Sequence, residues 1–314
     1  MTKIKMFSLS LVAFAIISCG GDTTETNTKT VGKNSNVAPG LESNTSSESS
    51  SAKDNIFRLN FSDPPTFDPA LVTDTTSASI IVEIFSGLVT LNKELDIIPD
   101  LAESWDISDD GRIYTFNLRD DIKFSNGDKV TASDFKWSIE RAANPDTGSM
   151  NAEVYLGDIV GVTEVIEAGG SLTEVSGLKV IDDKTLEITI DEPKTYFLAK
   201  LTYPTAFVLS EKYVTQQGED WIDQPVGTGP FVMTEYQIGQ TLKLKPNDNY
   251  WGEKAKVDGI IMNLAGGVSM AMYENDEVDI TGVGLADLER VKDPNDPLNK
   301  DLVNVTPQFS LNYI

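Results

Sequence analysis

Apolar and polar residues alternate on both sides of an Asp-Asp-Gly turn at residues 109–111. Trp105 and Ile107 precede the turn, and Tyr114, Phe116 and Leu118 follow it. Apolar residues at every second position, on either side of an Asp-Gly step, are typical of two antiparallel strands that form a hairpin. The pattern therefore predicts a hairpin with one buried face.

A second turn, at residues 125–128, contains Asn-Gly and is followed by a helical pattern. Thr131 is placed to cap the helix, and Asp134 follows three residues later, close to a capping box. Phe135, Ile139 and Ala142 recur at helical spacing. They predict the buried stripe of this helix.

The rest of the chain alternates between strand and helix patterns, with turn-rich connections. Residues 63–70 contain three prolines and cannot form a central strand. The other predicted elements are a strand at 56–61, helices at 77–91 and 154–167, a hairpin at 178–190, a short helix at 196–201 and a strand at 231–236. Mixed elements of this kind predict an α/β fold.

The N-terminus has the pattern of an export signal. Lys3 and Lys5 precede an apolar run at 6–17, too short to cross a membrane as a folded helix. The run ends in Ile-Ile-Ser-Cys, which resembles a bacterial lipobox and implies acylation of Cys19 as the first mature residue. An ordinary secretory peptide with an incidental cysteine is the alternative. Cys19 is the only cysteine, so an internal disulfide is excluded.

Residues 1–18 are thus expected to be a lipoprotein signal peptide. Residues 19–54, rich in Gly, Asp, Thr, Asn and Ser, are expected to be a disordered tether, because they cannot bury enough apolar surface to offset ordering. This predicts an exported protein, lipid-anchored to the bacterial membrane and facing the periplasm or the cell exterior.

The formal net charge of −24 would become about −26 after loss of the two signal-peptide lysines. This excess of acid argues against nucleic acid or an anionic membrane surface as the ligand. It leaves neutral or cationic solutes as the easier ligands. Solubility or a salty habitat explains the same charge without any ligand.

The chain has no histidine, which excludes a Ser-His-Asp or Cys-His catalytic site and a histidine-rich metal site. A pair of catalytic carboxylates cannot be excluded by counting, but no motif indicates one. Residues 106–117 superficially resemble a calcium loop, with Asn117 in place of the final Glu and strands in place of helices. We expect no enzyme activity, no cofactor and no metal.

Several motifs of residues 99–145 occur together in one known family. The run contains Leu-Ala-Glu-Ser-Trp at 101–105, a match to D-G-x-x-Y-T-F-x-L-R at 110–119, F-x-x-G at 124–127 and V-T-A-x-D-F at 130–135. In this order and spacing they resemble the solute-binding proteins of peptide-type ABC importers, solute-binding protein family 5. Val-Gly-Thr-Gly-Pro-Phe at 226–231 and N-x-x-Y-W-G at 247–252 add to the resemblance.

The resemblance implies an α/β fold of the two-lobed periplasmic-binding-protein type II kind, with an extra inserted subdomain. Residues 55–85 and 211–308 would form the first lobe, incomplete here, and residues 86–210 the inserted subdomain. Residues 309–314 would begin the crossover to a second lobe that is missing from this chain. The sequence is therefore interpreted as a fragment.

The function implied is capture of di- or oligopeptides and their delivery to ABC permease subunits, without bond chemistry, by a protein expected to be monomeric. The family pattern places Thr73, Asp74, Thr75, Asn151 and Thr228 at the ligand. Two simpler interpretations stay open. In the first, the Thr/Asp loop caps the following helix, with Thr75, Thr76 or Ser77 as N-cap. In the second, the Gly-Thr-Gly turn at 227–229 only leads into a strand.

Two other functions remain possible. One is a binder of the same family for a non-peptide solute such as an oligosaccharide, opine or metal chelate, with nickel less favoured because histidine is absent. The other is a surface interaction or adhesin lipoprotein without a transport role.

Overall fold

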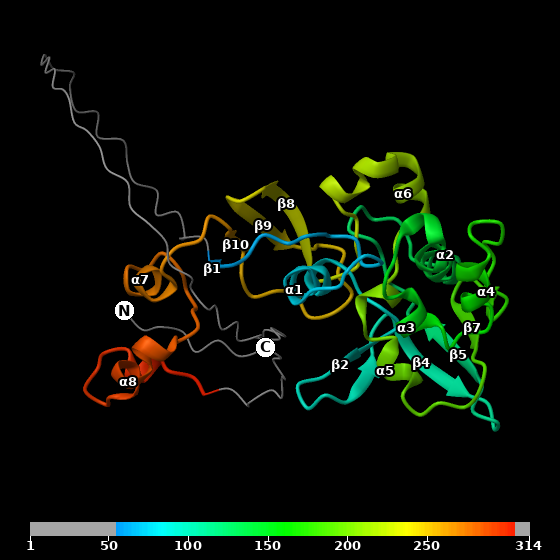
Figure 1. Ribbon diagram of the computed structural model, residues 1–314, viewed down its shortest axis with the longest axis horizontal. Helices are drawn as coiled ribbons and strands as arrows, with labels where there is room; N and C mark the ends of the chain where they lie inside the picture. Colours follow the sequence, from blue (N-terminus) through cyan, green and yellow to red (C-terminus); the bar gives the residue numbers. More distant parts are fainter. Residues whose placement is uncertain (1–54, 305–314) are drawn as a thin grey trace, which may run out of the picture. The chain divides into compact units, whose positions relative to one another are not determined.

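The computed structural model describes residues 55–304. Their contacts divide into a unit at 55–281 and a smaller one from residue 282 onward, and each is described by itself (Figure 1). The predicted signal peptide, the tether with Cys19 and the crossover at 309–314 lie outside the described residues.

One four-stranded sheet is built from segments far apart in the sequence. Its order is β1 (Ile56–Asn60), β10 (Gly259–Asn263), β9 (Thr241–Pro246) and β8 (Phe231–Gln237). β1 and β10 are parallel, and the other pairs are antiparallel. Helix α1 (Thr75–Ile84) contributes Ile80, Ile81 and Ile84 to the same apolar cluster as the inward residues of this sheet.

A second four-stranded sheet is entirely antiparallel. Its order is β4 (Ala102–Ile107), β5 (Ile113–Leu118), β7 (Thr185–Thr189) and β6 (Leu178–Asp182), which confirms both predicted hairpins. Helix α2 (Ala132–Ala143) contacts β6 and β7 (Figure 1). Its capping box of Thr131 and Asp134 is present, and Phe135, Ile139 and Ala142 are buried, as the pattern predicts.

Shorter elements complete the unit at 55–281. They are β2 (Val89–Leu91), β3 (Ile97–Pro99), α3 (Ala152–Leu156), α4 (Val162–Glu167), α5 (Phe197–Lys200), α6 (Glu211–Gln217), α7 (Ser269–Glu274) and 3₁₀ turns at Pro145–Thr147, Pro204–Ala206 and Gly218–Asp223. The smaller unit contains α8 (Leu285–Lys292) and a 3₁₀ turn at Asn299–Asp301. None of the helices in the described part of the chain has the length and apolarity needed to cross a membrane.

Two predicted helices are shorter than their apolar patterns. The helix expected at 77–91 ends at Ile84, because Phe85 is extended, and residues 89–91 form β2 instead. The helix expected at 154–167 is two helices, α3 and α4. Gly161, between them, has a left-handed φ of 94°, which interrupts a regular helix.

The unit at 55–281 has two hydrophobic clusters. One gathers residues between 88 and 208, together with Ala70, and the other gathers residues from 57–85 and 207–264. The contacts nevertheless join both clusters into one unit. The boundaries expected at 85/86 and 210/211 therefore stay a prediction.

A buried ion pair connects the turn-rich segment at 63–70 to helix α2. Arg141 donates from Nη1 and Nη2 to the two carboxylate oxygens of Asp68, at 3.1 and 2.5 Å. Asp68 Oδ1 also accepts from the Ala70 N–H at 2.9 Å, and the guanidinium lies 5.4 Å from the ring centroid of Trp221. Since Asp68 is only 3% exposed, this carboxylate depends on Arg141 for its charge balance.

We predict that Asp68→Asn lowers the free energy of unfolding by about 3–5 kcal/mol, because it leaves a mostly buried guanidinium without its counter-charge. Asp120→Asn is the control, since Asp120 pairs with Lys184 at the surface and its loss should not be measurable. Urea unfolding of both variants measures the difference. Equal stability of the two variants would show that the Asp68 pair contributes nothing special.

Candidate functional site

The backbone at residues 70–72 is held by side chains from a second stretch, residues 149–151. Ser149 Oγ donates to the Ala70 carbonyl at 2.5 Å, and Asn151 Nδ2 donates to the Val72 carbonyl at 2.6 Å. The two stretches therefore run alongside each other in the same direction. This arrangement fixes the path of the chain as it reaches Thr73.

Thr73 itself is exposed, and its backbone N–H and C=O form no hydrogen bond with any described residue. It lies between Val72, whose carbonyl is already bonded, and Asp74, whose backbone is extended with φ −130° and ψ 157°. Free main-chain groups beside a fixed, extended backbone can pair with another extended chain. A contact of Thr73 with ligand stays a prediction.

Asp74 is the N-cap of α1. Its Oδ1 accepts from the Ser77 N–H at 2.8 Å, so the capping interpretation of this loop is right. The choice of Thr75, Thr76 or Ser77 as the cap is wrong, because Thr75 and Thr76 already lie in the first turn and Ser77 supplies the donor. Thr75 is exposed at the start of α1. A contact of Asp74 or Thr75 with ligand stays a prediction.

Two tyrosines that the sequence analysis did not single out adjoin Asn151. The rings of Tyr155 and Tyr203 stack with centroids 3.7 Å apart and an interplanar angle of 4°. The Tyr203 hydroxyl accepts from Asn151 Nδ2 and donates to the Val72 carbonyl, each at 3.3 Å. Burial, helped by Tyr155 and the charge of Asp74, raises the pKa of the Tyr203 phenol. The spacing of four between Asn151 and Tyr155 is the signal that could have paired them.

Thr228 lies at the other end of α1, about 15 Å along a ten-residue helix from Thr73. It is 1% exposed, and its Oγ1 accepts from the Ser86 N–H at 3.0 Å. A Cβ on Gly227 would lie 2.0 Å from the Ile84 carbonyl oxygen. The two glycines thus allow the end of α1 to approach the turn closely. This geometry agrees with the structural interpretation of the turn, and a contact of Thr228 with ligand stays a prediction.

Buried ionisable groups surround this turn. Burial raises the pKa of Glu83 to about 7 and that of Asp100 to about 7, although the Trp251 indole and Arg119 favour the ionised form of Asp100. The Trp251 N–H is buried and makes no hydrogen bond of normal geometry to a described residue. Burial and the two carboxylates raise the pKa of Tyr250 to about 12. The groups around the turn at 227–229 are therefore buried side chains of the protein itself.

We predict that Thr228→Val lowers the free energy of unfolding by about 1–3 kcal/mol, because the buried Ser86 N–H loses its acceptor. Thr234→Val is the matched control, since Thr234 is exposed on β8 and its hydroxyl donates to the Lys243 carbonyl. Chemical denaturation of both variants measures the change. If Thr228→Val is as stable as Thr234→Val, the buried hydrogen bond has no structural importance.

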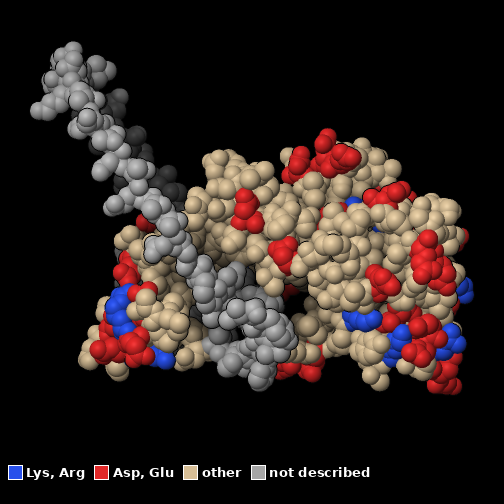
Figure 2. All heavy atoms as spheres, in the orientation of Figure 1, with Lys and Arg blue, Asp and Glu red and all other residues tan. Residues whose placement is uncertain are grey.

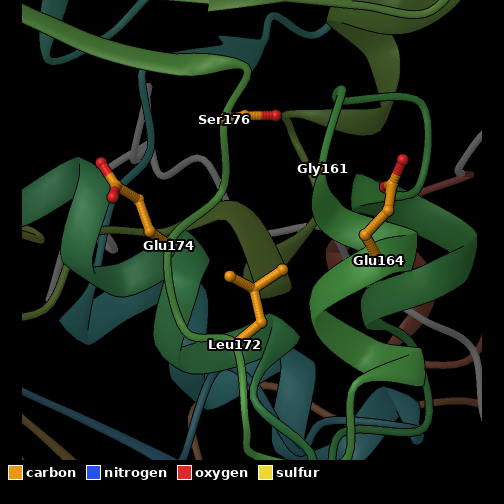
Figure 3. Close-up of a pocket in the computed structure, with 5 residues that line it drawn as sticks. All are labelled: Gly161, Glu164, Leu172, Glu174 and Ser176. Atoms are coloured by element: carbon orange, nitrogen blue, oxygen red, sulfur yellow. The ribbon is translucent and has the colours of Figure 1, made fainter.

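An open depression of about 510 Å³ lies beside α4. It is lined by Gly161, Glu164, Leu172, Glu174 and Ser176. Figure 3 shows Glu164 and Glu174 on opposite sides of it. Glu174 is 75% exposed and pairs with Lys136 at 3.1 Å, and none of the predicted ligand residues contributes to the lining. No group of three His, Cys, Asp or Glu side chains among residues 55–304 could hold a metal ion.

Comparison with known proteins shows the family. The family model described as bacterial extracellular solute-binding proteins, family 5 Middle, matches residues 96–314. The chain is 29% identical to the dipeptide-binding protein DppE of Bacillus subtilis, over 90% of this chain and 52% of DppE. It is 32% identical to the probable deoxycholate-binding periplasmic protein YgiS of Escherichia coli, over 74% of this chain and 44% of YgiS.

A solved structure has the same fold over most of this chain. Listeria monocytogenes OppA bound to peptide superposes with a TM-score of 0.72 and 30% identity, covering 78% of this chain and 50% of that one. The chain spans about half the length of the curated relatives that it matches. The α/β fold of the periplasmic-binding type, expected from the sequence, is confirmed. The chain belongs to the bacterial extracellular solute-binding proteins of family 5.

Proposed function

We propose that this protein is the extracytoplasmic solute-binding component of an ABC importer, and that it binds di- or oligopeptides in extended form. The observation that carries the proposal is the unpaired backbone of Thr73, presented by a stretch that Ser149 and Asn151 hold in place. Relatives named dipeptide-binding and oligopeptide-binding proteins support the same ligand class.

Pairing through the backbone suits a protein that accepts many peptides. Main-chain N–H and C=O groups are the same in every peptide, so they give affinity without selecting a side chain. The groups gathered around Thr73 are an amide, two phenols and a capping carboxylate. They can hold and orient a ligand, and the proposed role includes no bond chemistry.

We predict that Thr73→Pro weakens peptide affinity about tenfold, because proline removes the N–H that would pair with the ligand. Thr73→Ala keeps that N–H and should leave the affinity within about threefold. The measurement is isothermal titration of the protein expressed from its complete reading frame, with a mixed peptide library and, separately, with deoxycholate as a non-peptide ligand.

The two variants separate backbone pairing from side-chain contact. Equal weakening by Thr73→Ala and Thr73→Pro would contradict pairing through the backbone. Binding of deoxycholate but of no peptide would replace the peptide by a non-peptide solute, as the relationship to YgiS suggests. Melting temperatures of both variants check that neither effect comes from unfolding.

We also propose that the protein is a monomer held at the membrane through acylated Cys19 and delivers its ligand to the permease subunits of the importer. The lipobox-like Ile-Ile-Ser-Cys at the end of the apolar run supports the anchor. The predicted result is incorporation of labelled palmitate by the wild type in a bacterial host and none by Cys19→Ala. Equal labelling of the two would contradict the anchor.

A further inference from the structure

Two carboxyl groups are buried where the chain passes between the two hydrophobic clusters of the larger unit. Glu83, near the end of α1, and Asp100, directly after β3, are each 8% exposed. Phe85 belongs to one cluster and Leu88 to the other. The Asp100 N–H donates to the Leu88 carbonyl at 3.2 Å. Both carboxyl groups therefore belong to the segment that connects the clusters.

Main-chain groups of this segment are also bonded to the turn at 227–229. The Ser86 N–H donates to Thr228 Oγ1 at 3.0 Å, and the Gly229 N–H donates to the Ile84 carbonyl at 2.8 Å. The joint, as it is called below, consists of residues 83–88, Asp100 and the turn at 227–229.

The joint has little positive charge to balance its carboxyl groups. Glu83 accepts no hydrogen bond from any described residue. Arg119 is the cation beside Asp100, but its Nε donates to the main-chain carbonyl of Asp100 at 2.6 Å, and its guanidinium lies 3.8 Å from the centroid of the Trp251 ring. Burial and the two carboxylates raise the pKa of Tyr250 to about 12, so its phenol stays neutral. Two ionised carboxylates would therefore share one cation.

The main elements packed on α1 and β3 add no counter-charge to the joint. β8, which packs on α1, carries Glu235, and this side chain pairs with Lys243 at 2.7 Å. The Tyr236 hydroxyl, also on β8, donates to Asp63 at 2.8 Å. The 3₁₀ turn at Pro204–Ala206 has no charged residue, and the charged residues of β4, which packs on β3, are acidic.

We propose that the joint is a pH-sensitive connection between the two hydrophobic clusters, closed when Glu83 and Asp100 are protonated and loosened when both are ionised. A buried charge without a counter-charge is costly, whereas a neutral carboxyl group is much less so. Ionisation therefore favours conformations in which water reaches the carboxylates. The inference does not depend on the proposed function.

The connection responds to pH near neutrality. Burial raises the pKa of Glu83 and of Asp100 to about 7, against about 4 for an exposed carboxyl group. Between about pH 4 and about pH 7 the folded state therefore binds more protons than the unfolded state, and stability falls as the pH rises. The chain has no histidine, so the residue type that usually titrates in this range is absent.

The first test compares melting temperatures at about pH 5.5 and about pH 8, with the protein expressed from its complete reading frame. The wild type should melt about 10 °C lower at the higher pH, with each carboxyl group contributing about half. Glu83→Gln and Asp100→Asn keep the shape of the protonated groups, so each should halve this difference by raising the melting temperature at the higher pH. Glu103→Gln is the control, because Glu103 is exposed on β4 and its loss should change nothing.

Amide hydrogen exchange, corrected for its intrinsic pH dependence, tests whether the joint opens by itself. The Ser86 and Gly229 amides should be at least about tenfold less protected than the most protected amides of β5 and β7. Their protection should fall between about pH 5.5 and about pH 8, and Glu83→Gln should make that fall at least about tenfold smaller.

Three outcomes would overturn the inference. The first is a wild-type melting temperature that does not change with pH. The second is the same pH dependence in Glu83→Gln, Asp100→Asn and Glu103→Gln, which would assign it to other buried carboxyl groups, such as Asp134 and Glu140 on α2, whose pKa burial also raises. The third is equal protection of the joint and sheet amides at both pH values, because water would then reach the joint only through global unfolding.

Discussion

The buried pair of Asp68 and Arg141 is the constraint on which the candidate site depends. A carboxylate with 3% exposure is costly unless it is paired and hydrogen-bonded, and Arg141 and the Ala70 N–H together meet that need. Because Arg141 lies on α2, the pair fixes the turn-rich segment against that helix. Ala70 lies two residues after Asp68, and its carbonyl accepts a hydrogen bond from Ser149. The Val72 carbonyl, two residues further on, accepts one from Asn151. Each contact determines where the next can form, and the series ends at the free backbone of Thr73.

A site of this kind differs from one built by converging side chains. In the proposed site the recognition groups are main-chain atoms, and the side chains around them support the backbone. The acidic composition is consistent with that division, because no charged group is needed to bind a peptide backbone. Figure 2 shows acidic side chains scattered over the visible face among mostly uncharged residues. The excess of Asp and Glu over Lys and Arg in the sequence accounts for the net charge. High net charge favours solubility and does not determine the fold.

The sequence predicts those parts of the fold that local interactions determine. The hairpin at residues 102–118 follows from alternation around a turn, and the Thr131–Asp134 capping box follows from spacing within one helical turn. Local patterns do not identify which distant segment a residue will contact. The glycines around Thr228 correctly indicate close approach of a backbone, but the sequence does not say which one, and it is the end of α1. The sequence does not reveal Tyr203 as a partner of Asn151, because 52 residues separate them.

The support of Thr73 by other residues has a consequence for how affinity can vary. Asn151 holds the Val72 carbonyl, and the Tyr203 hydroxyl bonds both to that carbonyl and to the Asn151 amide. Loss of either group would leave the Val72 carbonyl with a single donor and let the chain at 72–74 take other conformations more readily. Ordering it again on binding would then cost conformational entropy, which a fixed backbone avoids. Under the proposed pairing of Thr73 with a peptide, Asn151 and Tyr203 therefore influence affinity through the backbone that they hold, even where neither touches the peptide.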